Sequence, residues 1–279
     1  MLTKTQLKDV FSKYGFRPLK RLGENYLIDA NIKDKVINEA RITKDDIVLE
    51  IGPGMGALTI ALAKSGASVI AVEKDRKAFA ILNDLTKGQF PNLKVIHGDI
   101  LEFDFKEISA SKKIKVVGNL PYYITTPIIE RLIGNRNFIE SILIMVQKEV
   151  AARLRAKAGA KDYGSISCFV QYYTRPVYIY TVKRTSFYPS PEVDSSLIRL
   201  DVLGKPSVEV SDERLFFKII RGAFNQRRKS IINSLSRKGV LGLSKEELSK
   251  VLNRIRIDPR LRPETLDLQD LAKISNALA

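Results

Sequence analysis

The sequence predicts an α/β protein in which a parallel, doubly wound sheet is followed by a small all-helical domain. Two observations carry this prediction. Short buried strands alternate with helices up to residue 203, and only helical patterns follow. Strands that alternate with helices form parallel sheets, because each helix carries the chain back to the edge where the next strand begins. The expected domains are therefore residues 1–203 and 204–279.

Each element follows from the spacing of its apolar residues. Apolar residues at helical intervals predict a helix in the first fourteen residues, before a basic stretch at 17–23, and a second helix at 31–40 with Asn31 or Asp29 as its cap. The expected strands are 47–51, 68–72, 94–96, 114–117, 141–146, 177–182 and 196–202, the last two as an antiparallel pair that closes one sheet edge. Further helices are expected at 57–64, 76–85, 127–133, 214–223, 227–237, 245–253 and 268–277.

The charge balance indicates a polyanionic partner. The chain has 47 Lys and Arg against 31 Asp and Glu, a net charge of +16. Residues 221–262 alone hold twelve basic and three acidic side chains. This uneven excess favours nucleic acid over a membrane surface, because no long amphipathic helix accompanies it.

The cysteine count and the apolar runs set the expected compartment. Cys168 is the only cysteine, so no internal disulfide can form, and one Cys with one His leaves no Cys–His metal site. The apolar runs are too short for a membrane span, and the N-terminus lacks the apolar core of a secretory signal. We expect a cytoplasmic monomer that binds no metal and does not associate with a membrane. The basic start of the chain leaves organellar import as the alternative.

A glycine turn follows the expected strand at 47–51. In Glu50-Ile51-Gly52-Pro53-Gly54, alternate glycines let the backbone turn sharply and approach a ligand closely. A dinucleotide site uses a similar turn, and the spacing does not exclude one. Glu50, however, suits a cationic amino group better than a pyrophosphate. Glu73 and Asp99 end the next two strands, where they suit ribose hydroxyls and an adenine amine. This layout predicts a site for S-adenosylmethionine.

A second motif, Asn119-Leu120-Pro121-Tyr122, ends the expected strand at 114–117. The Asn119 side-chain oxygen and the carbonyl before Pro121 can both accept hydrogen bonds from an aromatic amine, and the proline fixes their geometry. The Tyr122 ring offers a surface on which a base can stack. Two acceptors stabilise the positive charge that develops on an amine as a methyl group arrives. We therefore expect these four residues to be catalytic, with a plain Pro–Tyr turn as the alternative.

These motifs resemble those of the KsgA-type small-subunit rRNA adenine dimethyltransferases. The matching blocks are GENYL at 23–27, EIGPG at 50–54, NLPY at 119–122, QKEV at 147–150, FYPSPEVDS at 187–195 and FNQRRK at 224–229. The last two blocks are the more specific ones. Large-subunit rRNA methyltransferases of the erythromycin-resistance type share the cofactor and NLPY elements. A non-catalytic ribosome-assembly factor with the same fold is the alternative from another class.

The resemblance implies a Rossmann-like class I methyltransferase sheet with a small C-terminal helical domain. It also implies two methyl transfers from S-adenosylmethionine to each of two adjacent adenosines near the 3′ end of small-subunit (16S) rRNA in an assembling subunit. It assigns Asn25 and Leu27 to the methionine end of the cofactor, with Glu50, Gly52, Gly54, Glu73, Asp99 and Asn119 completing that site. It puts Tyr122 and Phe187 on either face of the target adenine.

Two further expectations concern charge. Phosphates of the RNA are expected on basic side chains, which position RNA without specifying its sequence: Arg221, Arg227, Arg228, Lys229, Lys148 and Arg153. The chain also departs from the family pattern at Glu24, where the family usually has glutamine. A carboxylate accepts hydrogen bonds but cannot donate them, so any contact through the amide hydrogens is lost.

Overall fold

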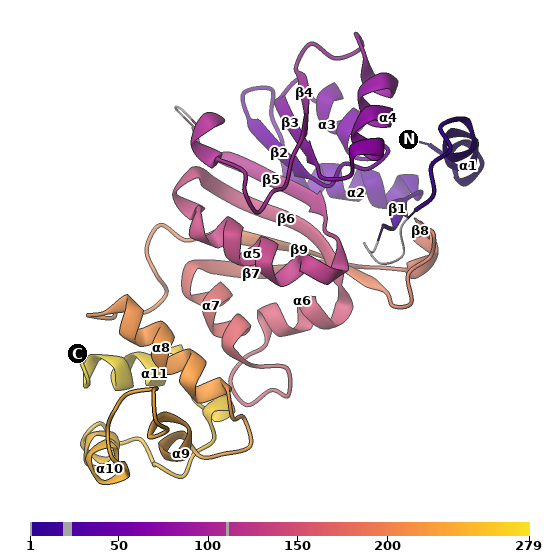
Figure 1. Ribbon diagram of the computed structural model, residues 1–279. Helices are drawn as coiled ribbons and strands as arrows, with labels where there is room; N and C mark the ends of the chain where they lie inside the picture. The colour runs from indigo at the N-terminus through magenta and orange to yellow at the C-terminus, as the bar shows by residue number, and fades with distance from the viewer. Residues whose placement is uncertain (1, 19–23, 110–111) are drawn as a thin grey trace. The chain divides into compact units, whose positions relative to one another are not determined.

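The computed structural model describes residues 2–18, 24–109 and 112–279 (Figure 1). The chain divides into two compact units, Met1–Ala151 with Val177–Val202 and Ala152–Pro176 with Leu203–Ala279. One crossing between the units lies between Val202 and Leu203, one residue before the expected boundary between residues 203 and 204. Residues 152–176 differ from the expectation because they belong to the helical unit, where the ring centroids of Tyr172 and Phe216 are 5.0 Å apart. Most of the expected basic stretch at 17–23 lies outside the described residues.

The larger sheet has seven strands in the order β4-β3-β2-β5-β6-β9-β7. Their bounds are β4 (Leu93–His97), β3 (Ser68–Glu73), β2 (Ile47–Ile51), β5 (Ile114–Asn119), β6 (Ile139–Gln147), β9 (Ser195–Val202) and β7 (Thr174–Val182). The strands from β4 to β6 pair in parallel, and β9 runs antiparallel to β6. This confirms the predicted Rossmann-like sheet, with the two later strands at one edge.

The helices of this first unit are α1 (Lys4–Lys13), α2 (Ala30–Ala40), α3 (Thr59–Lys64), α4 (Arg76–Thr86), α5 (Thr125–Gly134) and α6 (Lys148–Arg155), the last of which continues into the second unit. Three of them, α1, α2 and α4, begin after a residue whose side chain caps them. Of the two candidate caps of α2, the structure uses Asp29, whose carboxylate accepts from the N–H groups of Asn31 and Ile32. Asp75 caps α4 in the same way through the N–H of Ala78.

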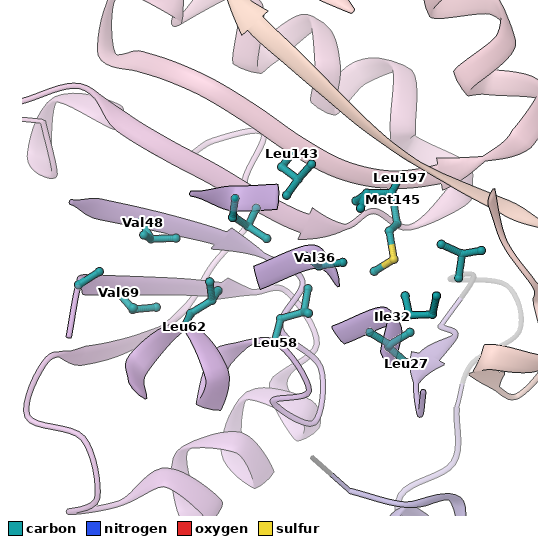
Figure 2. Close-up of a cluster of buried hydrophobic side chains, with 14 of the residues drawn as sticks. Leu27, Ile32, Val36, Val48, Leu58, Leu62, Val69, Leu143, Met145 and Leu197 are labelled. Carbon is teal, nitrogen blue, oxygen red and sulfur yellow. The ribbon is translucent and has the colours of Figure 1, made fainter. Parts of the chain in front are cut away.

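Strands and helices meet in a buried apolar cluster (Figure 2). Val48 of β2 and Met145 of β6 are 0% exposed, and they share the cluster with Val36 of α2 and Leu62 of α3. Full burial of each such side chain contributes about 1.5–3 kcal/mol. This burial holds the parallel strands in one register and so fixes where their carboxyl ends lie.

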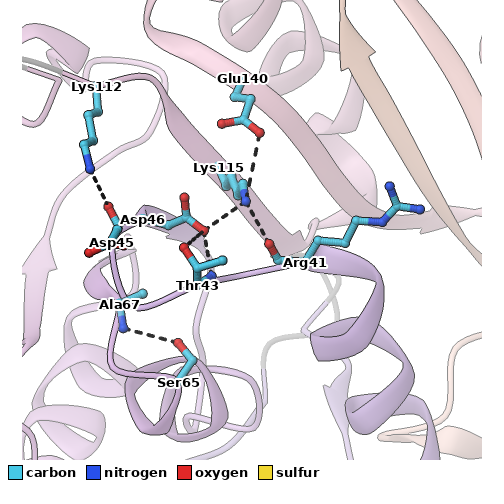
Figure 3. A network of polar contacts seen from close by, with 9 residues as sticks. All are labelled: Arg41, Thr43, Asp45, Asp46, Ser65, Ala67, Lys112, Lys115 and Glu140. Atoms are coloured by element: carbon cyan, nitrogen blue, oxygen red, sulfur yellow. Dashed lines mark hydrogen bonds and ion pairs between the residues drawn. The ribbon is translucent and has the colours of Figure 1, made fainter.

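A polar network ties together the amino ends of three strands (Figure 3). Lys115, at the start of β5, donates to an Asp46 carboxylate oxygen at 2.9 Å and to the Arg41 carbonyl at 2.8 Å. It also lies 3.9 Å from the carboxylate of Glu140 in β6. Asp46 in turn accepts from the Thr43 N–H at 2.7 Å. The Lys115–Asp46 contact is partly buried, so it is the one that joins the starts of β2 and β5 most firmly, at the edge opposite to the glycine turn.

A second, two-stranded sheet joins distant parts of the sequence. Strand β1 (Tyr26–Leu27) runs antiparallel to β8 (Phe187–Tyr188), with Tyr26 opposite Tyr188 and Leu27 opposite Phe187. Strands of two residues are too short to show any periodicity, which is why the sequence did not predict them. Their pairing places the chain between residues 24 and 27 beside the carboxyl edge of the larger sheet.

The second unit is helical apart from the first residues of β7, as far as the chain is described. Its helices are α7 (Ser165–Tyr173), α8 (Glu213–Phe224), α9 (Ile231–Leu235), α10 (Lys245–Arg254) and α11 (Leu268–Asn276). Short 3₁₀ helices in the two units are Phe105–Glu107, Tyr122–Ile124, Arg136–Phe138, Arg184–Ser186 and Pro263–Thr265. Within the described ranges, every helix is too short or too polar to cross a membrane.

The predicted helix at 227–237 is wrong in its first turn. Only Ile231–Leu235 is helical, and Ser230 before it is extended with φ −66° and ψ 159°. The preceding residues form a turn in which the Lys229 N–H donates to the Gln226 carbonyl at 2.9 Å. The basic triplet at 227–229 therefore lies in a turn between α8 and α9, not on a helix.

Gly118 provides a test of the packing that positions the end of β5. A Cβ at this position would lie 2.9 Å from the Ile51 carbonyl oxygen, a backbone atom of the neighbouring strand. Backbone in a parallel ladder cannot move without shifting the strand, so we expect Gly118→Ala to lower the free energy of unfolding by about 1–3 kcal/mol in denaturant titrations. Gly134→Ala is the matched control, because nothing lies within 4 Å of its added Cβ. Equal stability of the two variants would contradict this account.

Candidate functional site

A cavity of about 310 Å³ lies at the carboxyl ends of β2, β3 and β5. This is the edge at which open α/β sheets bind their ligands. Its lining includes the strand-end residues Glu50, Glu73 and Asn119, together with Asn25 and Leu27. The β1–β8 pairing therefore brings the predicted methionine-end residues to the same cavity as the three predicted strand-end residues.

The glycine turn has the backbone that its composition predicts. Gly52 and Gly54 have φ values of +63° and +56°, in the left-handed region that favours glycine. A Cβ on Gly54 would lie 2.8 Å from the ring of Tyr26. The turn thus needs glycine both for its conformation and for the close approach of β1. Both glycines line the cavity.

Glu50 is buried at the end of β2 with one oxygen unsatisfied. Its side chain is 2% exposed, and among the described residues Oε2 finds no hydrogen-bond partner. Burial, with a smaller contribution from the charge of Glu73, raises the pKa of Glu50 from 4.5 to about 8. A buried carboxyl group with an unsatisfied oxygen at a cavity wall is a site for a cationic donor.

Glu73 ends β3, and Asp99 lies two residues after the end of β4. Glu73 accepts from the Gly54 N–H at 3.0 Å and from the Asp75 N–H at 2.8 Å. Burial raises the pKa of Glu73 above its ordinary value, although these two hydrogen bonds act to lower it. Asp99 is paired with Lys74, at 2.6 Å between Nζ and Oδ2. Burial alone would raise the pKa of Asp99, but the Lys74 ammonium and the Leu101 N–H hold it below its ordinary value. Both carboxylates line the cavity, and their predicted roles toward ribose and adenine stay predictions.

Asn119 and Asn25 are brought together by a direct hydrogen bond. The Asn119 side-chain N–H donates to the Asn25 carbonyl at 2.8 Å. Because this bond uses the amide nitrogen, the side-chain oxygen remains the acceptor that the predicted chemistry needs. Asn119 therefore connects the end of β5 to the chain before β1.

The rest of the predicted catalytic motif is divided between cavity and core. Pro121 lines the cavity, whereas Leu120 is 1% exposed and leaves only its backbone groups to take part. Tyr122 is half-buried outside the cavity lining, and its hydroxyl lies 2.6 Å from the Ser195 hydroxyl. Its neighbour Tyr123 does line the cavity and is 48% exposed. Sequence analysis missed Tyr123, although the doubled tyrosine after the proline was a usable signal.

Phe187 is not among the residues that line the cavity, and its stacking on a base stays a prediction. Its side chain is 2% exposed and lies in the apolar cluster with Leu27, its partner across β1 and β8. A ring buried in this way offers no face to a ligand without leaving the core. The sequence did not reveal this, because an aromatic residue before a proline-rich segment has the same appearance in a loop and in a short buried strand.

The predicted RNA-binding residues differ in how strongly their own unit holds them. Arg227 donates to the Lys161 carbonyl at 2.6 Å and lies 3.6 Å from the Glu264 carboxylate, so its guanidinium is partly engaged. Its neighbours in the second unit are exposed: Arg221, Arg228, Lys229 and Arg153. Lys148 is exposed in the first unit, where its backbone N–H donates to the Asp194 carbonyl at 3.0 Å.

The sequence analysis also missed the contribution of the N-terminal helix to the cavity. Leu2 and Leu7 line it, and Leu7 packs in a second apolar cluster with Phe11 and with Met55 of the glycine turn. The Tyr14 hydroxyl hydrogen-bonds the Asp84 carboxylate of α4. These apolar contacts had a signal in the helical spacing of the first fourteen residues, but the spacing did not show what the helix covers.

The sheet order, the glycine turn and the acceptors at successive strand ends define a Rossmann-like, S-adenosylmethionine-dependent methyltransferase. The chain also matches the family model for ribosomal RNA adenine dimethylase over residues 15–279. Because this match covers most of the sequence, the chain belongs to the ribosomal RNA adenine dimethylase family.

Similar proteins agree with this assignment. The chain is 45% identical over 282 residues to ribosomal RNA small subunit methyltransferase A of Geobacillus sp. (strain WCH70), covering 99% of this chain and 97% of that protein. It is 43% identical to the protein of the same name from Bacillus mycoides (strain KBAB4), covering 99% of this chain and 96% of that protein.

Two solved structures extend the comparison. A dimethyladenosine transferase from Plasmodium falciparum has a TM-score of 0.78 at 27% identity, covering 89% of this chain and 95% of that one. The 23S rRNA methyltransferase ErmE has a TM-score of 0.69 at 24% identity, covering 91% of this chain and 99% of that one. At this identity, the similarity to ErmE supports only the fold.

The residues present fit the cofactor. The unsatisfied oxygen of Glu50 suits the ammonium group of the methionine end, since that group brings both charge and N–H donors. Glu73 and Asp99 provide further carboxylate acceptors for hydroxyl and amine hydrogens, and Gly52 and Gly54 leave room for a close approach of the ligand to the backbone.

The buried carboxyl of Glu50 predicts a pH-dependent stability. Its pKa is raised to about 8, so the unfolded chain ionises this group first, and the ligand-free protein loses stability between about pH 4.5 and about pH 8. Glu50→Gln removes this titration. The melting temperature of the variant relative to the unsubstituted protein should therefore rise across that range and level off above it. Glu130→Gln, on an exposed residue of α5, is the control and should show no such trend. A difference in melting temperature between Glu50→Gln and the unsubstituted protein that stays the same at every pH would contradict the burial argument.

The bond between Tyr122 and Ser195 predicts a coupled effect on stability. Ser195 is 0% exposed, so removing either hydroxyl leaves the other without this partner. In the double-mutant cycle of Tyr122→Phe and Ser195→Ala, we expect a coupling of about 1 kcal/mol in the free energy of unfolding. The measurement is denaturant unfolding of the two single variants and the double variant. Additive losses would show that the bond does not hold the Tyr122 ring.

Proposed function

We propose that the protein transfers methyl groups from S-adenosylmethionine to the N6 amines of two adjacent adenosines near the 3′ end of small-subunit rRNA. The products are dimethyladenosines, with two methyl groups on each base. One observation carries the proposal: Asn119, whose amide nitrogen is engaged by the Asn25 carbonyl, lines the same cavity as the buried acceptor Glu50. Family membership and the names of the relatives support the choice of RNA substrate.

The chain's own residues would hold the cofactor by charge and hydrogen bonding. When bound, S-adenosylmethionine supplies an electrophilic methyl group on a positively charged sulfur. Glu50 would accept from the ammonium group, Glu73 from the ribose hydroxyls, and Asp99 from the adenine amine. Asn25 and Leu27 would contact the methionine end through the segment that β8 holds in place.

Asn119 and the Leu120 carbonyl would act on the target amine. The lone pair of an adenine amine is delocalised into the ring, so the amine is a poor nucleophile. Two acceptors on its hydrogens favour the pyramidal form and stabilise the positive charge that develops during transfer. The amine carries a positive charge once it has taken the methyl group, and this cation is acidic enough to lose its proton to water, so the mechanism needs no histidine base.

The target base must leave the helical stack before it can enter the cavity. Tyr122 is the proposed stacking surface, with its hydroxyl hydrogen-bonded to Ser195, and it is next in the chain to Tyr123, which lines the cavity. A base stacked on an aromatic ring gains about 1–3 kcal/mol, which offsets part of the cost of unstacking it.

Exposed basic residues would hold the RNA backbone. Arg221, Arg228 and Lys229 offer a cationic surface around the turn between α8 and α9, and Arg153 and Lys148 offer further charges on α6. Contacts of this kind bind phosphates without reading sequence. We further propose that the protein acts as a monomer on an assembling small subunit in the cytoplasm.

The test of the function is a methylation assay with radiolabelled S-adenosylmethionine. Partially assembled small subunits, mature small subunits and large-subunit RNA are offered separately, and the labelled nucleoside is identified after nuclease digestion. We expect labelled dimethyladenosine from the partially assembled small subunits. Label in large-subunit RNA alone would overturn the choice of substrate. No label, together with tight binding to the particles, would indicate an assembly factor without activity.

Asn119→Ala should separate chemistry from RNA binding. The substitution removes the acceptor for the target amine but leaves the exposed basic residues in place, so methyl transfer should be nearly abolished while affinity for the particles changes less than about twofold. Arg228→Ala is the complementary variant, and it should weaken particle binding in a salt-dependent way. Equal loss of binding and transfer in Asn119→Ala would contradict this division of roles.

A further inference from the structure

The cavity wall carries a carboxylate for which the motifs provide no role. Glu24 lines the cavity together with Glu50 and Glu73, at the position where the family motif usually has glutamine. In all, five carboxyl side chains and only two basic ones, Lys74 and Arg76, line this cavity. Its wall is therefore acidic, although the chain as a whole has a net charge of +16.

The Glu24 side chain is held at the wall by Tyr26. The Tyr26 hydroxyl donates a hydrogen bond to the Glu24 carboxylate, and burial, with the charges of Glu24 and Glu73, raises the pKa of Tyr26, so that it remains a donor. The Tyr26 ring has little freedom, because it lies against Gly54 and its centroid is 5.4 Å from that of Phe11. The carboxylate at position 24 is thus fixed on the cavity side of β1.

Glu50 independently indicates that this cavity is built for positive charge. Its side chain is 2% exposed, and Oε2 has no partner among the described residues. The methyl donor and its product differ in charge at one atom, because the sulfur of S-adenosylmethionine is cationic and that of S-adenosylhomocysteine is neutral. A fixed carboxylate in a partly buried cavity attracts the first and is indifferent to the second.

We propose that Glu24 is a specificity-determining residue that makes the cavity prefer S-adenosylmethionine to S-adenosylhomocysteine. Its carboxylate attracts the cationic sulfur of the donor and loses that attraction once the methyl group has been transferred. The product then leaves more readily than it would from a cavity with glutamine at position 24. This inference rests on the proposed function, because it takes S-adenosylmethionine as the ligand.

Glu24→Gln tests the proposal because it removes the charge and little else. The glutamine has the same length and keeps an oxygen that can accept from Tyr26. Isothermal titration calorimetry gives the dissociation constants of S-adenosylmethionine, S-adenosylhomocysteine and sinefungin, an analogue with a cationic amine near the position of the sulfur. We expect the preference for S-adenosylmethionine over S-adenosylhomocysteine to fall about fivefold, and sinefungin to follow S-adenosylmethionine. Glu130→Gln, outside the cavity on α5, should leave the preference unchanged.

An unchanged preference in folded Glu24→Gln would overturn the proposal. A wild-type protein that binds none of the three ligands would overturn the proposed function instead, which keeps the two failures distinct. If Glu24→Gln does not fold, the wild-type protein still provides a test. Salt screens the attraction, so its preference for S-adenosylmethionine should shrink as ionic strength rises from about 0.05 to about 0.5 M. A preference independent of salt would then overturn the proposal.

Discussion

The burial of the Glu50 carboxyl group is the interaction on which the rest of the site depends. A buried polar atom without a partner costs about 1–3 kcal/mol, and here it is Oε2 of a strand-end glutamate. The surrounding structure compensates through packing, since Val48 and Leu49 of the same strand are 0% exposed. A cationic ligand that donates to Glu50 removes this cost. The free energy gained in this way adds to the affinity for the ligand.

The neighbouring groups of the site are satisfied from within, and this makes the cavity rigid. Glu73 is held by two backbone N–H groups, one of which belongs to Gly54 of the glycine turn. Asn119 is held by the Asn25 carbonyl. At the opposite edge of the sheet, the Lys115–Asp46 contact joins the starts of β2 and β5 (Figure 3). Acceptors on three strands therefore stay in a fixed mutual arrangement.

The contrast between the acidic cavity and the basic chain has a physical consequence for the proposed substrate. A polyanionic RNA is attracted to exposed side chains such as Arg228 and Lys229, whereas its phosphates are repelled by the carboxylates of the cavity wall. A neutral base can enter where a phosphate cannot. In the proposed function, charge thus separates the residues that would hold the RNA from the cavity that would hold the cofactor and the target amine.

Much of this protein followed from the sequence alone, because strands and helices that bury apolar residues repeat with a period that local sequence shows. The parallel sheet was predicted in this way, and the motifs at or just after its strand ends indicated Glu50, Glu73, Asp99 and Asn119, whose common edge follows from parallel topology. Tertiary structure alone decided that Phe187 is buried, that the basic triplet at 227–229 lies in a turn, and that Tyr26 holds Glu24 at the cavity wall. These outcomes depend on contacts between residues far apart in the chain, such as the pairing of Leu27 with Phe187, and such contacts leave no periodic signal in the sequence.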